Sequence, residues 1–125
     1  MYPPLLIEHF QNPRNVGELA PPAITVEVSN PACGDVLRLS VLWQDGRVAE
    51  SRYKVRGCTA SIAAGSALTE WLAGKTRAEV SGFDASEIDA AVGGLPPASK
   101  HAAVLCADGV KALLRGNSRP GASRT

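Results

Sequence analysis

The chain has 125 residues, of which 45% are hydrophobic and 20% are charged, and its formal net charge is +1. This size and composition suit one globular domain with a single core, and the near balance of 13 basic and 12 acidic residues gives no reason to expect nucleic acid or an anionic membrane as a partner. No apolar run approaches the roughly 20 residues that span a bilayer, and the N-terminus lacks the basic start of a secretory signal, so a cytoplasmic location is expected.

The N-terminal half of the chain predicts a short helix followed by an antiparallel sheet. The helix covers residues 5–12 and is ended by Pro13. Three segments in which apolar and polar side chains alternate predict strands: residues 23–30, 35–43 and 46–56. Asp45-Gly46 between the last two segments is typical of a hairpin turn. We therefore expect a three-stranded meander with one face exposed to water.

From Gly57 onward the spacing of apolar residues becomes helical. A helix over residues 58–74 can be capped by Thr59 or Ser61 at its start and ended by Gly74. Three more helices are expected along the rest of the chain: residues 76–80, 84–92 and 98–116.

The order of these elements is a helix, three strands and then helices. That order predicts an α+β domain, in which helices pack on one face of a three-stranded antiparallel sheet. We expect this single domain to span residues 1–116. The remaining residues, 117–125, are polar and rich in Gly, Ser and Pro, so a disordered tail is expected there.

The three cysteines are Cys33, Cys58 and Cys106, an odd number that argues against a disulfide framework. Cys33 lies in a Pro-Ala-Cys-Gly-Asp loop that leads into the second strand, two residues before Asp35. Cys58 opens a helix, whose N-terminus stabilises a thiolate. Because the start of one strand of a hairpin faces the end of the next, we expect Cys33 and Cys58 at the same edge of the sheet.

His101 lies in the first turns of the last predicted helix. If that helix start lies over the same edge, then Cys33, Asp35, Cys58 and His101 offer sulfur, oxygen and nitrogen ligands together. Such a mixed set suits tetrahedral zinc or an iron–sulfur cluster. Taken singly, each of these residues is also explained by plain packing, by a strand end or by an ordinary helix surface.

The remaining cysteine and histidine have structural explanations. Cys106 shares a helical stripe with Ala103, Val110 and Leu113, which indicates a place in the core. The alternative for Cys106 is an accessory thiol or a further ligand of the metal site. His9 stands in the first helix without an identifiable partner, so we expect it to be structural or to face solvent.

Four long motifs carry a resemblance to a known family. They run through nearly the whole chain before the tail: "IEHFQNPRNVGEL" (7–19), "NPACGDVLRLSV" (30–41), "VRGCTASIAAGSALTEWLAGKT" (55–76) and "LPPASKHAAVLCADGVKALL" (95–114). With these motifs the chain resembles the IscU/NifU N-terminal family of iron–sulfur cluster assembly scaffolds.

The resemblance implies a fold and a function. The family fold is a three-stranded antiparallel sheet packed with helices. A cysteine desulfurase delivers sulfur to the scaffold as a persulfide, iron joins it, and a [2Fe–2S] cluster forms and is passed to acceptor apoproteins. Members often bind zinc when no cluster is present. The family's ligands match Cys33, Asp35, Cys58 and His101 of this chain, with Asp35 as the residue that makes the site labile.

Other family features are matched less completely. Tyr2 falls at the spacing of an N-terminal tyrosine found in scaffolds. The stretch 95–99, Leu-Pro-Pro-Ala-Ser, keeps half of a chaperone-recognition motif, so a chaperone is an expected partner. The family's third cysteine follows its histidine, where this chain has Ala102. The flanking residues align without a gap, so Cys106 is not that cysteine displaced by an insertion.

The missing third cysteine leaves three hypotheses. The first, which we prefer, is a working scaffold with a variant site, in which a small shift of the last helix brings Cys106 within reach. The second is a metal-binding regulatory relative that docks on the desulfurase but builds no cluster. The third is a zinc-dependent sulfur acceptor that uses Cys33 or Cys58.

Overall fold

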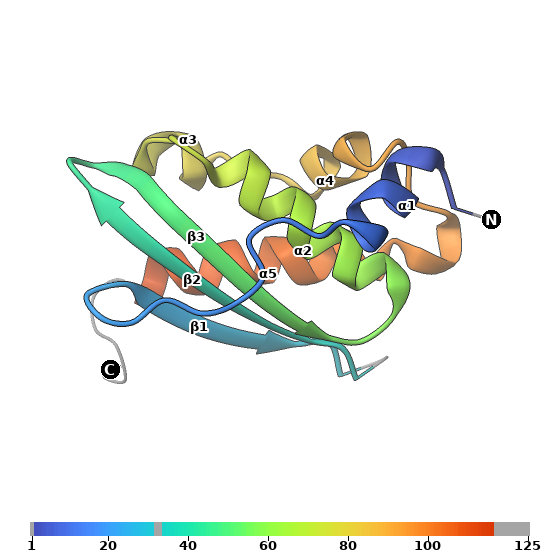
Figure 1. Ribbon diagram of the computed structural model, residues 1–125, viewed down its shortest axis with the longest axis horizontal. Coiled ribbons are helices and arrows are strands. Elements are labelled where there is room, and N and C mark those ends of the chain that lie inside the picture. Colours follow the sequence, from blue (N-terminus) through green and yellow to red (C-terminus); the bar gives the residue numbers. More distant parts are fainter. Residues whose placement is uncertain (1, 32–33, 117–125) are drawn as a thin grey trace.

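The computed structural model describes residues 2–31 and 34–116, so Cys33 and the predicted tail lie outside the described residues. The described elements follow one another in the predicted order (Figure 1): α1 (Pro4–Gln11), β1 (Ile24–Ser29), β2 (Val36–Gln44), β3 (Arg47–Arg56), α2 (Thr59–Leu72), α3 (Arg77–Ser81), α4 (Ala85–Ala91), a 3-10 turn (Pro97–Ser99) and α5 (His101–Gly116). The predicted α+β fold is confirmed.

The three strands form one antiparallel sheet in the order β1-β2-β3. The β2–β3 hairpin turns at Asp45 and Gly46, whose φ angles of 54° and 76° are both positive. Two positive φ angles in a two-residue loop match the twist of the flanking strands, so the predicted hairpin is confirmed. On β2 the inward residues Leu37, Leu39 and Val41 are buried.

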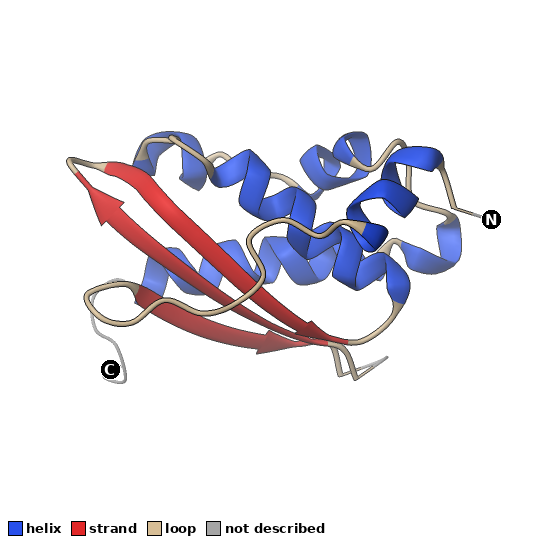
Figure 2. Cartoon of the chain, viewed as in Figure 1, coloured by secondary structure: helices blue, strands red, loops and turns tan. Residues whose placement is uncertain are grey.

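Helices cover the inner face of the sheet (Figure 2). Helix α2 packs against β3, and helix α5 packs against β1 and β2. Small residues on α2 allow a close approach: a Cβ on Gly65 would lie 2.4 Å from the ring of Tyr53. The tight contact holds the start of α2 beside the end of β3, and this is the edge where the candidate site lies.

The start of α2 differs from the prediction. Its N-cap residue is Cys58, whose side chain makes no capping hydrogen bond. The expectation that Thr59 or Ser61 caps the helix is therefore wrong, because both residues lie inside its first turn. The side chain of Ser61 instead forms a hydrogen bond with Asp35.

The later helix starts agree more closely with the sequence pattern. Thr76 forms a capping box with Glu79 at α3, and Asp84 accepts a hydrogen bond from the backbone of Ser86 at α4. The last helix was predicted from residue 98, but a 3-10 turn comes first and α5 begins at His101. Pro96 is extended, with ψ 152°, as the residue before a proline usually is.

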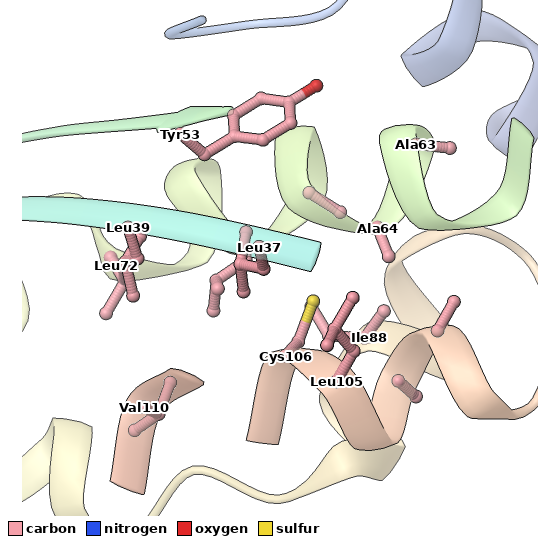
Figure 3. Packing of buried hydrophobic residues seen from close by; sticks show 14 of the residues in the cluster. Leu37, Leu39, Tyr53, Ala63, Ala64, Leu72, Ile88, Leu105, Cys106 and Val110 are labelled. Carbon is pink, nitrogen blue, oxygen red and sulfur yellow. The ribbon is translucent and has the colours of Figure 1, made fainter. Parts of the chain in front are cut away.

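The core lies between the sheet and the helices (Figure 3). The predicted stripe on α5 is buried throughout: Ala103, Cys106, Val110 and Leu113. In Figure 3 the Cys106 side chain lies among buried apolar residues, with Leu37 and Leu105 close by. None of the described helices has both the length and the apolar character that a membrane crossing requires.

Candidate metal centre

The register of the hairpin places Asp35 next to Cys58. Val36 at the start of β2 pairs with Arg56 at the end of β3. Asp35 and the Gly57-Cys58 corner extend this pair by one and two residues, so they meet at one edge of the sheet. Cys58 lies at this edge with Asp35 beside it. The prediction that Cys33 shares the edge with Cys58 falls on a residue outside the described ones.

The start of α5 lies over the same edge. Nε2 of His101 is 3.5 Å from Sγ of Cys58 and 3.4 Å from Oδ2 of Asp35. Sγ of Cys58 is 3.6 Å from the same carboxylate oxygen. One ligand atom from each of the three residues lies within 4.8 Å of the others. The last helix therefore begins over the sheet edge, which is the condition under which His101 could be a ligand together with Asp35 and Cys58.

The three groups differ in their exposure to solvent. Asp35 is buried, with 4% of its surface exposed, whereas Cys58 is partly exposed. The side chain of His101 is 26% exposed. The group therefore has a buried carboxylate and two candidate ligands that solvent can reach, so an ion can approach the thiol without an opening of the core.

Gly57 makes room for the carboxylate. A Cβ at this position would lie 2.6 Å from Cγ and from Oδ1 of Asp35, well inside van der Waals contact. Any other residue at position 57 would push the carboxylate away from Cys58 unless the backbone moved. The absence of a side chain at Gly57 is therefore required for the Asp35 carboxylate to lie beside Cys58.

Ser61 is a site residue that the sequence reasoning missed. Its hydroxyl donates a hydrogen bond to Oδ2 of Asp35 and lies 3.4 Å from Sγ of Cys58. The available signal was the spacing, because residues three apart in a helix share a face. The sequence pattern alone indicates only a capping role for Ser61.

The donor set suits a metal ion of intermediate softness. A thiolate, an imidazole and a carboxylate are all zinc ligands, and thiolate and imidazole also hold iron–sulfur clusters. The residues present therefore fit a metal, with Cys58, Asp35 and His101 as three described candidate ligands.

Cys106 and Ala102 lie elsewhere in the packing. Cys106 is 1% exposed, and burial raises the pKa of its thiol to about 12. It is not part of the Asp35, Cys58 and His101 group within the described residues. Ala102, where the resemblance places a third cysteine, has no exposed surface.

His9 and Tyr2 lie outside the described metal group. His9 is buried and its Nδ1 is 2.8 Å from the hydroxyl of Ser66, so the structural alternative holds and the solvent-facing one is wrong. Burial lowers the pKa of His9, although the Glu70 carboxylate acts in the opposite direction. Tyr2 is partly buried against the core.

Comparisons with known proteins find similar proteins over most of the chain. The family model of the NifU-like N terminal domain matches residues 1–117. The iron-sulfur cluster assembly scaffold protein IscU of Azotobacter vinelandii is 38% identical over 118 residues, which cover 91% of this chain and 91% of that protein. The bifunctional protein NifU/MnmA of Rubrobacter xylanophilus is 43% identical over 109 residues, which cover 86% of this chain but only 22% of that protein.

A solved structure shares the fold. It is a proposed iron-sulfur cluster assembly scaffold protein for the SUF system from Fervidobacterium islandicum, with a TM-score of 0.71 and 19% identity. The match covers 90% of this chain and 96% of that one. At this identity the likeness shows the fold alone, and it agrees with the predicted architecture.

Proposed function

The chain belongs to the NifU-like N-terminal domain family, and from that premise we propose that it is a scaffold on which an iron–sulfur cluster is assembled and from which it is passed on. The observation that carries the proposal is the meeting of Asp35, Cys58 and His101 at one partly open edge of the sheet. Relatives that match most of the chain are named as iron-sulfur cluster assembly scaffolds.

The proposed ligands of the cluster are Cys33, Asp35, Cys58 and His101. Two thiolates, one imidazole and one carboxylate bind a cluster more weakly than four thiolates do. The reason is that iron–sulfur clusters prefer thiolate sulfur to carboxylate oxygen as a ligand. Weak binding suits a cluster that is later transferred to another protein, most simply a [2Fe–2S] cluster. The same four residues would hold zinc in the cluster-free form.

We assign the receipt of sulfur to Cys58 or Cys33. In this step the thiolate attacks the outer sulfur of a cysteine desulfurase persulfide, a new S–S bond forms on the scaffold, and the desulfurase thiolate leaves. Cys58 is partly exposed, whereas the buried Cys106, with its raised pKa, carries little thiolate at neutral pH. This chemistry also supports a second candidate function, a zinc-dependent sulfur acceptor that builds no cluster.

The proposal includes partners and a location. The cysteine desulfurase supplies sulfur, an acceptor apoprotein takes the cluster, and a chaperone that reads residues 95–99 assists the transfer. Leu95 and Ser99 are buried, whereas Pro97 and Ala98 between them are exposed. A partner could therefore contact the middle of this stretch directly, but contact with Leu95 or Ser99 would require them to move away from the core. A cytoplasmic location is proposed for all of these steps.

Anaerobic reconstitution with ferrous iron and sulfide tests the function. The wild-type chain should gain the visible absorbance of a [2Fe–2S] cluster, contain iron and sulfide in equal amounts, and transfer both to an apo-ferredoxin. Cys58→Ala should hold no cluster, and Cys106→Ala should hold it as the wild type does. A wild-type chain that binds zinc but never yields a cluster would instead support the sulfur-acceptor function. Persulfide mass on each cysteine after mixing with desulfurase and cysteine then tests that alternative.

A further inference from the structure

We propose that Ser61 is a positioning residue of the metal site, which holds the Asp35 carboxylate in the orientation that binds the metal. The inference rests on the proposed function because it concerns the same site. It adds a residue that is not itself a ligand and that acts through Asp35.

The first support is the choice of oxygen. The Ser61 hydroxyl donates to Oδ2 of Asp35, and this is the same oxygen that faces Sγ of Cys58 at 3.6 Å and Nε2 of His101 at 3.4 Å. A carboxylate turns about its last side-chain bond over a broad range. A hydrogen bond to this one oxygen selects the rotation that turns it toward the other two ligands.

The second support is the burial of both partners. Ser61 is 1% exposed and Asp35 is 4% exposed, so water competes little for their hydrogen bond. A buried hydroxyl is costly unless it is paired. The neighbouring inward positions of α2 are Ala60, Ala63 and Ala64, none of which has exposed surface. An alanine would fill position 61 with the same packing, so the distinctive contribution of the serine is its hydroxyl.

The third support is the agreement between two neighbours of the carboxylate. Gly57 leaves the space into which the Asp35 carboxylate fits, since a Cβ there would lie 2.6 Å from it. Ser61 supplies the directional contact, and the same hydroxyl lies 3.4 Å from Sγ of Cys58. The two residues thus fix where the carboxylate lies and how it is turned.

The expected role follows from the general behaviour of hydrogen bonds behind metal ligands. Such partners orient the ligand before the metal arrives, and their removal typically costs about 10–100-fold in metal affinity. Without the hydroxyl, Asp35 must be reoriented when the metal binds. We therefore expect Ser61→Ala to bind metal about 10-fold more weakly than the wild type.

A double-mutant cycle with Co²⁺ as the probe tests the proposal. Anaerobic Co²⁺ titrations, followed by the cobalt–thiolate and d–d absorption bands, would give the Kd of the wild type, Ser61→Ala, Asp35→Ala and the double variant. The Ser61→Ala change should cost about 10-fold in the wild-type background and nothing further once Asp35 is absent. Its d–d bands should also change, because the coordination of the carboxylate changes.

Three controls make the outcome decisive. Ser61→Thr keeps a hydroxyl and should restore most of the affinity, and Thr59→Ala in the same helical turn should leave the Kd unchanged. Thermal unfolding of each metal-free variant shows that it folds. An unchanged Kd in Ser61→Ala, or an equal loss in the Asp35→Ala background, would overturn the positioning role while leaving the metal site intact. A wild-type chain that gives no cobalt–thiolate band would contradict the proposed function itself, and the role of Ser61 would fall with it.

Discussion

Sγ of Cys58 lies 3.5 Å from Nε2 of His101, although the two residues are 43 positions apart in the chain. The contact joins the start of α2 to the start of α5, because both helices begin at the edge where the hairpin strands β2 and β3 meet the Asp35 and Gly57-Cys58 segments. A thiol and an imidazole at this distance can bind one metal ion together with the carboxylate of Asp35.

The first prediction concerns His101 as a ligand. His101→Ala should weaken Zn²⁺ binding by more than the roughly 10–100-fold that is typical of the loss of a partner behind a ligand, since an imidazole is removed from the metal itself. Competition with a chromophoric chelator measures the Kd. Lys100→Ala is the matched control, because Lys100 pairs with the partly exposed Asp89 and such pairs contribute little. Equal affinities for His101→Ala and Lys100→Ala would refute the ligand role.

The second prediction concerns the space at Gly57. Gly57→Ala should destabilise the fold by about 1–3 kcal/mol through overpacking and should also weaken Zn²⁺ binding, because the new Cβ displaces the carboxylate of Asp35. Urea unfolding and zinc competition measure the two effects. Gly82→Ala is the control, since a Cβ there meets no atom closer than 3.5 Å. If Gly57→Ala bound zinc as tightly as Gly82→Ala, the close approach would have no bearing on the site.

The third prediction concerns the pH dependence that Cys106 causes. Burial raises the pKa of its thiol from 9.0 to about 12 in the folded chain. Between these values the folded state keeps a proton that the unfolded state loses, so stability falls as pH rises, by up to about 1.4 kcal/mol per pH unit. The contribution is fully present below pH 9. Between pH 8 and about 10.5 the free energy of unfolding of Cys106→Ala should therefore fall less than that of the wild type.

The comparison with Cys106→Ala also separates this effect from other groups. Burial raises the pKa of Tyr53 to about 12 as well, and the charge of Cys106 adds a smaller rise. Tyr53 and its burial are retained in both chains, and Cys106→Ala removes only the smaller contribution. A wild-type chain and a Cys106→Ala chain with parallel pH profiles would show that the thiol titrates normally, and hence that Cys106 is not confined to the core.

The fourth prediction concerns acid sensitivity at His9. Burial lowers the pKa of His9 below 6.5 in the folded chain, so the unfolded chain binds a proton first as pH falls. The contribution of neutral His9 to stability is present above about pH 6.5 and is lost as pH falls toward the folded-state pKa. His9→Gln should lose less stability than the wild type between pH 7 and 5 in urea titrations.

A second variant checks the cause of the acid sensitivity. The Glu70 carboxylate raises the pKa of His9 against the effect of burial, so Glu70→Gln should lower that pKa further. The Glu70→Gln chain should therefore lose stability more steeply than the wild type as pH falls. A shallower loss in Glu70→Gln would contradict the assignment of the acid sensitivity to His9.

Much of the fold follows from local patterns that the sequence shows directly. Alternation predicts the strands, and Asp45-Gly46 predicts the hairpin that brings the start of β2 beside the end of β3. The core position of Cys106 followed from helical periodicity. These features depend on neighbours in the chain or on one short turn, so they can be predicted without a tertiary model.

The parts that escaped prediction depend on contacts between distant segments. Ser61 could be a cap by its local position, and only the packing of α2 against β3 turns its hydroxyl toward Asp35. His9 shows no partner in its own helix, because its hydrogen-bond partner Ser66 comes from α2. The position of His101 over the sheet edge depends on how all the intervening helices pack, which the sequence pattern does not show. The ligand role of Cys33 stays a prediction.

X-ray absorption at the zinc edge of the zinc-loaded chain shows whether Cys33, Asp35, Cys58 and His101 bind one metal. We expect two sulfur neighbours at about 2.3 Å and two nitrogen or oxygen neighbours at about 2.0–2.1 Å. One sulfur should disappear in Cys58→Ala, and the spectrum should be unchanged in Cys106→Ala. A zinc shell that keeps all its sulfur in Cys58→Ala, or that loses sulfur in Cys106→Ala, would refute this ligand set.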